Sequence, residues 1–258
     1  MMMFTDMKKT WESRRQSGLS LIELMISLAI GLLLVVVISN VYLAGRQSFR
    51  DQDESARLQE TGRFVLDMVS RVVLEAGRAD VAPDNALQRF ILIPGAGLAI
   101  DGVDGAGVAS DTLIIRFASA SGGEVDCLGS GTGGTAAVPV VITQTLTFDN
   151  VQRELECTSS IGNITQPLAS NVEDFQLTFG VDSNGAVGGW NVDRYVPPTT
   201  ANAPNALTVR VCVLVTTADG MAPAAQQFAD CNGAAVIAGD RRIRRAFTKV
   251  IGLRNRLG

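Results

Sequence analysis

The 258-residue sequence contains no histidine. Histidine is the most frequent general base and a common metal ligand. Its absence therefore excludes Ser-His-Asp and Cys-His catalytic arrangements and all His-ligated metals. Chemistry by Asp, Glu or Lys stays open, but no pair of these residues stands out. We therefore expect no catalytic residues, no metal and no cofactor, in a protein that is not an enzyme.

Cysteine is scarce, and no two of the four cysteines are spaced as C-x-x-C, which argues against a zinc or thioredoxin-like site. In an oxidising compartment they allow three disulfide connectivities, and the sequence alone does not choose among them. Nearness in sequence favours Cys127–Cys157 together with Cys212–Cys231. The alternative, four reduced thiols in a cytosolic protein, conflicts with the leader described below.

Proline first occurs at Pro83. Because proline breaks helices, its absence permits one helix from about Leu19 to Ala76, roughly 85–90 Å long. Residues 42–77 keep a helical spacing of apolar side chains, and Gly77 is the expected C-cap. The expected weak points of this helix are Gly31, Gly45 and Gly62.

A basic leader, residues 1–18, precedes a 23-residue apolar run, Leu19–Val41, whose one charge is Glu23. About 20 apolar helical residues span a bilayer core. A secretory signal would be shorter and cut after the run, whereas here the natural cut lies before it. Basic residues in the leader favour a cytoplasmic N-terminus, and the cysteines favour a periplasmic domain beyond the membrane. Removing the leader, a net +2, takes the formal charge from −4 to −6, so no nucleic acid is expected as partner.

The segment Arg14–Met25 resembles the class III leader of type IV pilins and type II secretion pseudopilins. The resemblance implies that a prepilin peptidase cuts between Gly18 and Leu19 and N-methylates Leu19, although the family usually has Phe at that position. It also implies that Glu23 pairs with the N-terminal amine of a neighbouring subunit during assembly. A carboxylate in an apolar segment usually marks function.

Glu23 also has a local interpretation. Ser20 to Glu23 fits the S-x-x-E capping box, and an acidic group suits the positive end of a helix dipole. The two interpretations are compatible, because a subunit contact can replace a cap on assembly.

From residue 78 onwards short apolar runs alternate with turns. Asp149-Asn150 is expected to form a tight hairpin turn. The predicted fold class is α+β: a long N-terminal transmembrane-plus-stem helix packed on an antiparallel sheet, resembling type IV pilins. The expected strands are Thr112–Ala118, Pro139–Phe148, Val151–Cys157, Phe175–Val181, Leu207–Thr216 and Phe247–Leu253.

Internal motifs narrow the resemblance to the PilW minor pilins. The stem reads Ala-Arg-Leu-Gln-Glu-Thr-Gly-Arg-Phe over residues 56–64, close to that family's "ARLQENGRF". Further similar segments are Gln47–Arg50, Val172–Leu177, Gly180–Asp182, Asp193–Tyr195 and the closing stretch Arg241–Arg256.

Two acidic turns, Asp101–Gly105 and Asp182–Gly185, invite a calcium interpretation, but neither fits the EF-hand spacing. Asp and Gly in turns need no ion, so we favour plain turns at both. The basic tail of Arg241, Arg242, Arg244, Arg245, Lys249, Arg254 and Arg256 is interpreted as a solvated strand face, with docking of an acidic partner or of lipid headgroups as the alternative.

The resemblance implies a minor pilin that takes part in initiating and capping the type IV pilus, within a minor-pilin complex. The rivals are a J-type pseudopilin of a type II secretion system and a signal-anchored periplasmic enzyme or binding protein. The expected partners are the prepilin peptidase, other minor pilins, the major pilin and the inner membrane, with a tip adhesin left open. The expected location is the inner membrane, single-pass, and then the fibre tip. The expected segments are the leader 1–18, the transmembrane helix 19–42, the stem 43–77 and a periplasmic domain 78–258.

Overall fold

The computed structural model describes Gly18 and residues 20–78, 92–93, 97–105, 107, 109–119, 123–133, 139–183, 191–220, 222 and 224–257. Contacts divide the chain into two compact units, Met1–Arg50 and Asp51–Gly258. The expected boundaries after residues 18, 42 and 77 stay predictions.

One helix, α1, spans Leu21–Leu74, which confirms a single long helix. A turn over residues 75–77 ends it, and Gly77 has the left-handed φ of +71° expected of a C-cap. The Gly77 N–H donates to the carbonyl of Arg116, at 2.9 Å, rather than back to the helix. The end of α1 is thereby joined to strand β4 (Thr112–Ser119).

In the first unit, every described residue of α1 is exposed. These side chains are mostly Leu, Ile and Val, and by length and composition the helix could cross a membrane. Burial of so much apolar surface is favourable, so this stretch requires lipid or other protein around it.

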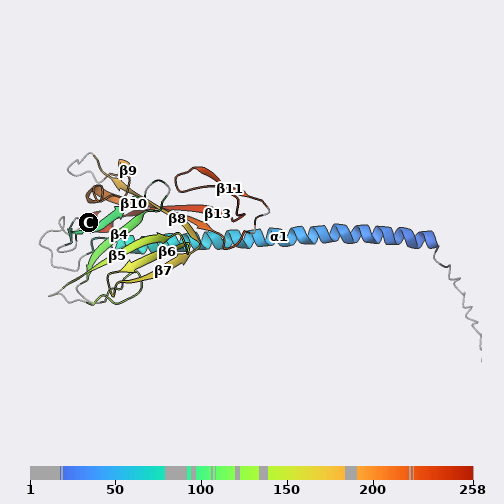
Figure 1. Cartoon of the computed structure of the whole chain (residues 1–258), viewed down its shortest axis with the longest axis horizontal. Helices are drawn as coiled ribbons and strands as arrows, with labels where there is room; N and C mark the ends of the chain where they lie inside the picture. Colours follow the sequence, from blue (N-terminus) through green and yellow to red (C-terminus); the bar gives the residue numbers. More distant parts are fainter. Residues whose placement is uncertain are drawn as a thin grey trace, which may run out of the picture. The chain divides into compact units, whose positions relative to one another are not determined.

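In the second unit, one stripe of α1 is buried against the sheets (Figure 1). Its members recur every three or four residues, the spacing of one helix face. The buried residues of α1 are Leu58, Gly62, Val65, Leu66, Val69, Ser70, Val72 and Val73.

The sheet structure is antiparallel, as predicted, but forms two principal sheets rather than one. One has the order β3-β4-β5-β6-β7 and the other β13-β10-β8-β9, and both share a core with α1. The first consists of β3 (Ile100–Val103), β4, β5 (Val140–Asp149), β6 (Glu154–Ser159) and β7 (Ile164–Ser170). The second consists of β8 (Val172–Val181), β9 (Arg194–Val196), β10 (Ala206–Thr216) and β13 (Arg244–Gly252).

Two ribbons and two short helices complete the described elements. The ribbons are β1 (Leu92–Ile93) with β2 (Gly97–Leu98), and β11 (Gln226–Ala229) with β12 (Ala235–Ala238). The helices are η1 (Ala203–Asn205) and α3 (Arg254–Leu257).

All six expected strands are confirmed, with ends within three residues of the prediction; the expected strand Val151–Cys157 is shifted along the chain to Glu154–Ser159. The chain turns through the four residues 150–153, and strand pairing resumes with Glu154 opposite Asp149. The predicted two-residue hairpin turn is therefore wrong. The Asp149 carboxylate accepts hydrogen bonds from the N–H groups of Val151 and Gln152, and this side-chain contact stabilises the longer turn.

Strand β7 was not predicted, because Pro167 and its polar neighbours do not read as a strand. It lies at the edge of its sheet and pairs only with β6. Proline is tolerated at a sheet edge, where the missing N–H need not serve a second strand.

Candidate functional site

The expected processing site lies at the start of α1. Gly18 is exposed, and a β-carbon there would have no neighbour within 4 Å. Leu19 and residues 1–17 lie outside the described residues. Cleavage between Gly18 and Leu19 and methylation of Leu19 therefore stay predictions.

Glu23 lies in the first turn of α1 and is exposed. The Ser20 carbonyl accepts the N–H groups of Glu23 and Leu24, at 3.0 and 3.2 Å, so the backbone of Ser20 begins the helix. Neither the Ser20 hydroxyl nor the Glu23 carboxylate bonds to another described residue, so the reciprocal capping box is not formed among them. The carboxylate of Glu23 is thus available to a partner from another chain.

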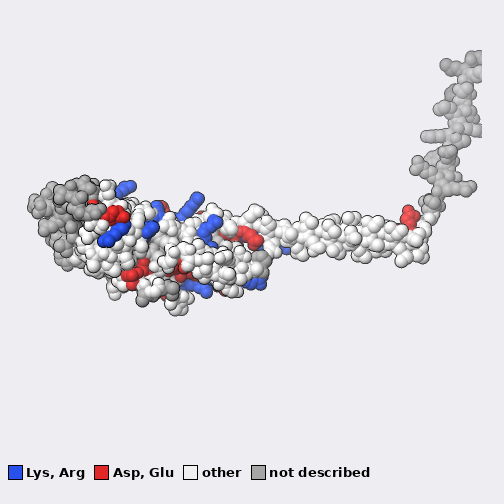
Figure 2. Space-filling view, turned by 90° about the horizontal axis from the view of Figure 1, so that it is seen from above, with Lys and Arg blue, Asp and Glu red and all other residues white. Residues whose placement is uncertain are grey.

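The residues after Glu23 carry no charge until Arg46. On the face shown in Figure 2, the red of acidic residues appears in the apolar part of α1 only at the N-terminal end of the helix. The hydroxyls of Ser27 and Ser39 donate to carbonyls four residues earlier, at 2.8 and 2.7 Å. These serines are therefore satisfied within the helix and suit an apolar environment.

The four cysteines form two disulfides, Cys127–Cys157 and Cys212–Cys231. These are the pairs that nearness in sequence favours, and no thiol is free. The first joins the loop after β4 to β6, and the second joins β10 to the turn between β11 and β12.

The first acidic turn is organised by protein groups. Asp101 accepts the N–H of Gly102, and the Gly105 N–H donates to Asp111 at 2.8 Å. Asp111, which the sequence did not single out, is 1 % exposed and also accepts the Leu177 N–H. Burial raises the pKa of Asp111, and the two backbone hydrogen bonds oppose that rise.

The second acidic turn lies partly outside the described residues, at residues 184 and 185. In the described part, Ser183 donates from its N–H and its hydroxyl to the carboxylate of Asp193. The hydrogen bond from the hydroxyl is the main cause that lowers the pKa of Asp193. Among the described residues, no three Asp, Glu or Cys side chains are grouped so as to hold a metal ion.

A second carboxylate that the sequence did not reveal is the half-buried Glu75, directly after α1. It accepts a hydrogen bond from the amide of Gln144, at 2.7 Å, and Gln144 is fully buried on β5. Burial raises the pKa of Glu75, and the contact with Gln144 opposes that rise. The two residues are far apart in sequence, so no local signal could have paired them.

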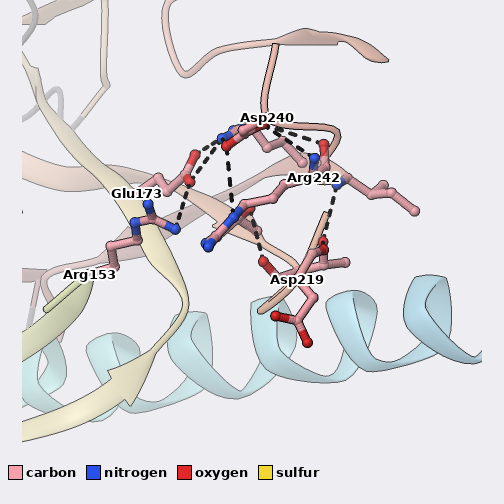
Figure 3. A network of polar contacts seen from close by, with 9 residues as sticks. Arg153, Glu173, Asp219, Asp240 and Arg242 are labelled. Atoms are coloured by element: carbon pink, nitrogen blue, oxygen red, sulfur yellow. Dashed lines mark hydrogen bonds and ion pairs between the residues drawn. The ribbon is translucent and has the colours of Figure 1, made fainter. Parts of the chain in front are cut away.

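Part of the basic tail makes ion pairs and hydrogen bonds with other residues of the second unit (Figure 3). Arg244 forms ion pairs with Glu173 on β8 and, at 2.5 Å, with Asp240, and its side chain is only 7 % exposed. Its guanidinium also lies 5.2 Å from the ring centre of Phe228 on β11. The hydrogen bonds between Arg244 and Asp240 lower the pKa of the carboxyl and raise that of the guanidinium. Arg244 thus joins the β11–β12 ribbon to the sheet β13-β10-β8-β9.

Other tail residues are also engaged. Arg242 lies 3.8 Å from Asp240, and the Lys249 ammonium lies 3.4 Å from Asp67 on α1. The Arg241 side chain donates to a backbone carbonyl. Arg244 is thus taken into contacts within the unit, whereas Arg241, Arg245 and Arg254 are exposed, so the expected solvated face is confirmed only in part.

Comparison with known proteins gives two sequence matches. Residues 13–39 match the prokaryotic N-terminal methylation motif, and residues 131–255 match the type IV pilus-assembly protein W family, PilW. No curated protein matches the chain. Among solved structures, a type IV-like pilin from Thermus thermophilus is similar over 77 % of this chain and 97 % of its own, with 12 % identity and a TM-score of 0.47.

The methylation motif contains Gly18, Glu23 and much of the apolar stretch, on one long helix followed by antiparallel sheets. This combination defines a type IV pilin-like protein. The match to the PilW model over residues 131–255, together with the methylation motif, supports a type IV pilus minor pilin of the PilW family. The two matches imply processing by a prepilin peptidase, a membrane anchor and assembly with other pilins; the matched family consists of structural proteins and not of known enzymes.

Proposed function

We propose that this minor pilin takes part in initiating and capping the type IV pilus, as one subunit of a minor-pilin complex. The prepilin peptidase cuts between Gly18 and Leu19 and methylates Leu19. Residues 19–42 hold the product in the inner membrane, with the domain from residue 78 onwards in the periplasm. The subunit then moves into the fibre tip.

The lone carboxylate of the apolar helix carries this proposal. Glu23 has no described partner in its own chain, and the apolar side chains that follow it are exposed. A charge in such surroundings is costly unless it is paired. The N-terminal amine created by cleavage on a neighbouring subunit would supply the opposite charge.

The two disulfides support the periplasmic placement. Disulfides persist in the bacterial periplasm and are rare in the cytosol. Both lie in the second unit, beyond the apolar stretch.

The test is the charge-removing substitution Glu23→Gln, expressed at normal level in a strain that lacks the gene. If Glu23 were only a cap, the effect would be below about 1 kcal/mol, because Gln also serves in the capping box. We expect insertion and cleavage to persist, while crosslinks to other pilins and sheared surface pili fall. Glu54→Gln, the same change farther along α1, is the matched control and should behave as wild type.

Normal piliation and crosslinking by Glu23→Gln would contradict the pairing role. A second measurement tests the place in assembly: loss of an initiating subunit should lower the number of fibres per cell without shortening those that form. Labelling of the chain along whole fibres, rather than at their ends, would refute the capping role. Reduced type II secretion with normal pili would favour the J-type pseudopilin instead.

A further inference from the structure

The outer face of the sheet β13-β10-β8-β9 carries a pocket of about 420 Å³. Strand alternation separates the two faces: Phe179 and Val211 are buried in the core, whereas Thr178 and Arg210 line the pocket. In the sheet register, Thr178 lies opposite Arg210. One row farther along, Cys212 lies between Gln176 and Thr248, which also line the pocket.

The guanidinium of Arg210 is held in a fixed orientation. It stacks over the ring of Tyr195 on β9, 3.8 Å from the ring centre, and its Nε donates to the Thr178 hydroxyl at 3.1 Å. Gly180, opposite Tyr195, makes the stack possible, because a β-carbon there would lie 3.1 Å from the Tyr195 ring and 2.2 Å from the Thr208 hydroxyl.

The outer edge of this guanidinium is unused. Within the part of the chain that the structure describes, neither Nη group of Arg210 has a hydrogen-bond or ion-pair partner. A guanidinium fixed through Nε and its face presents two parallel N–H donors, the geometry that binds a carboxylate in a bidentate manner.

The remaining walls combine polar and apolar groups. Gln176, Thr178, Thr248 and Asn232 supply hydroxyl and amide groups, and Val196 and Pro197 supply apolar surface of the kind that packs against a sugar ring. The disulfide Cys212–Cys231 brings the turn that carries Asn232 over the sheet.

The backbone of β10 pairs with strands on both sides. On its other side β8 pairs with β9 over Phe179–Val181, and its Phe175 and Leu177 N–H groups donate to Ser110 and Asp111. Few backbone groups are therefore left for an extended peptide to add itself here as a strand. A ligand must instead be bound by side chains, which suits a polyhydroxylated molecule.

We propose that this pocket binds an acidic saccharide, with the sugar carboxylate on Arg210 and the sugar hydroxyls on the amide and hydroxyl side chains around it. Asp104, at the rim, is an acidic wall residue that opposes the ligand's charge. The site gives the minor pilin a binding activity of its own. It does not depend on Glu23 or on fibre assembly, and so stands or falls separately from the proposed function.

The test is calorimetric titration of the full-length chain in detergent micelles. The probes are trigalacturonate, its methyl ester and hexaglutamate. The ester keeps the ring hydroxyls but removes the charge, and the peptide keeps the carboxylates without the sugar. We expect the acid to bind at least about tenfold more tightly than either, since hydrogen bonds to charged groups are among the strong ones. No binding of trigalacturonate, or equal affinity for the ester or the peptide, would overturn the proposal.

Variants locate the contact. Arg210→Gln should weaken binding of trigalacturonate at least about tenfold, and Arg210→Lys should also weaken it, because an ammonium lacks the forked geometry. Arg194→Gln removes the same charge from β9, at a position that does not line the pocket, and should leave affinity unchanged. Asp104→Asn should leave affinity equal or raise it. If circular dichroism shows that Arg210→Gln does not fold, Arg210→Lys decides. Wild-type affinity in the folded Arg210 variants, or a loss confined to Asp104→Asn, would refute the assignment.

Discussion

At the scale of single residues, Arg244 and Glu23 differ in whether the fold provides a partner for their charge. Arg244 has its counter-ions Glu173 and Asp240 beside it in the fold. Glu23 has none among the described residues, although it lies at the head of an apolar stretch. Charges in apolar surroundings require partners. The fold supplies those of Arg244, and we propose that assembly with another subunit supplies that of Glu23.

A prediction at this scale concerns Gly18. Gly18→Glu places a charged side chain next to the proposed cut, and the peptidase must accommodate that residue closely. We expect the full-length precursor to accumulate, measured by immunoblot and by the mass of the N-terminal peptide. The wild-type product should begin at Leu19. Any other mature N-terminus would contradict the proposed processing.

At the scale of elements, the two parts of α1 differ in burial. Its first part is exposed throughout, whereas its second part buries one stripe against two sheets. Gly62 belongs to that stripe. It looked like a weak point in the sequence, but a β-carbon there would lie only 2.6 Å from Cγ of Phe247 on β13. The glycine allows helix and strand to approach.

We therefore expect Gly62→Ala to destabilise the second unit. Overpacking costs about 1–3 kcal/mol, and the better helix propensity of Ala returns at most about 1 kcal/mol. Denaturant unfolding of the full chain in detergent would measure the change. Gln59→Ala, at an exposed position of the same helix, should be nearly neutral. Adding Phe247→Leu to Gly62→Ala should recover part of the loss, and no recovery would argue against the proposed clash.

The disulfides join elements that the sheet ladders leave apart. Closing loops of 30 and 19 residues stabilises by about 3–4 kcal/mol each on the chain-entropy view. We expect Cys127→Ala/Cys157→Ala and Cys212→Ala/Cys231→Ala each to lower the free energy of unfolding by about that amount. Peptide mapping of the oxidised chain should find only these two pairs. A cross-pair, such as Cys127 with Cys212, would contradict the fold around β6 and β10.

At the scale of the whole molecule, carboxyl groups of two kinds give stability a maximum in mild acid. The pKa values of Glu75 and Asp111 are raised by burial, so the folded state binds protons more readily than the unfolded chain. Their contribution is present in full below the unfolded pKa, about 4, and is lost as pH rises through the folded pKa values. The pKa of Asp240 is lowered, so its contribution is lost below about pH 4.

We therefore expect the free energy of unfolding to rise as the pH is lowered from neutrality through the raised pKa values of Glu75 and Asp111, and to fall again below about pH 4. Unfolding by denaturant across this range would measure it. Glu75→Gln should flatten the limb on the alkaline side of the maximum, and Asp240→Asn should flatten the acid limb. Stability that rises steadily up to neutral pH would show that Glu75 and Asp111 do not dominate.

The sequence by itself determined the features that depend on neighbours along the chain. The apolar stretch with Glu23, the helix, the six expected strands and the preferred cysteine pairs all follow from spacing and composition. Local spacing failed at Asp149, where a side-chain contact lengthened the turn, and at β7, where an edge position tolerated Pro167. Only the tertiary structure decided which groups meet across long separations. Asp111 receives the N–H of Leu177, Glu75 receives the amide of Gln144, and Arg210 stacks on Tyr195. Such contacts depend on sheet register and burial, which are set by the folding of the entire core and leave no periodic signal in the sequence.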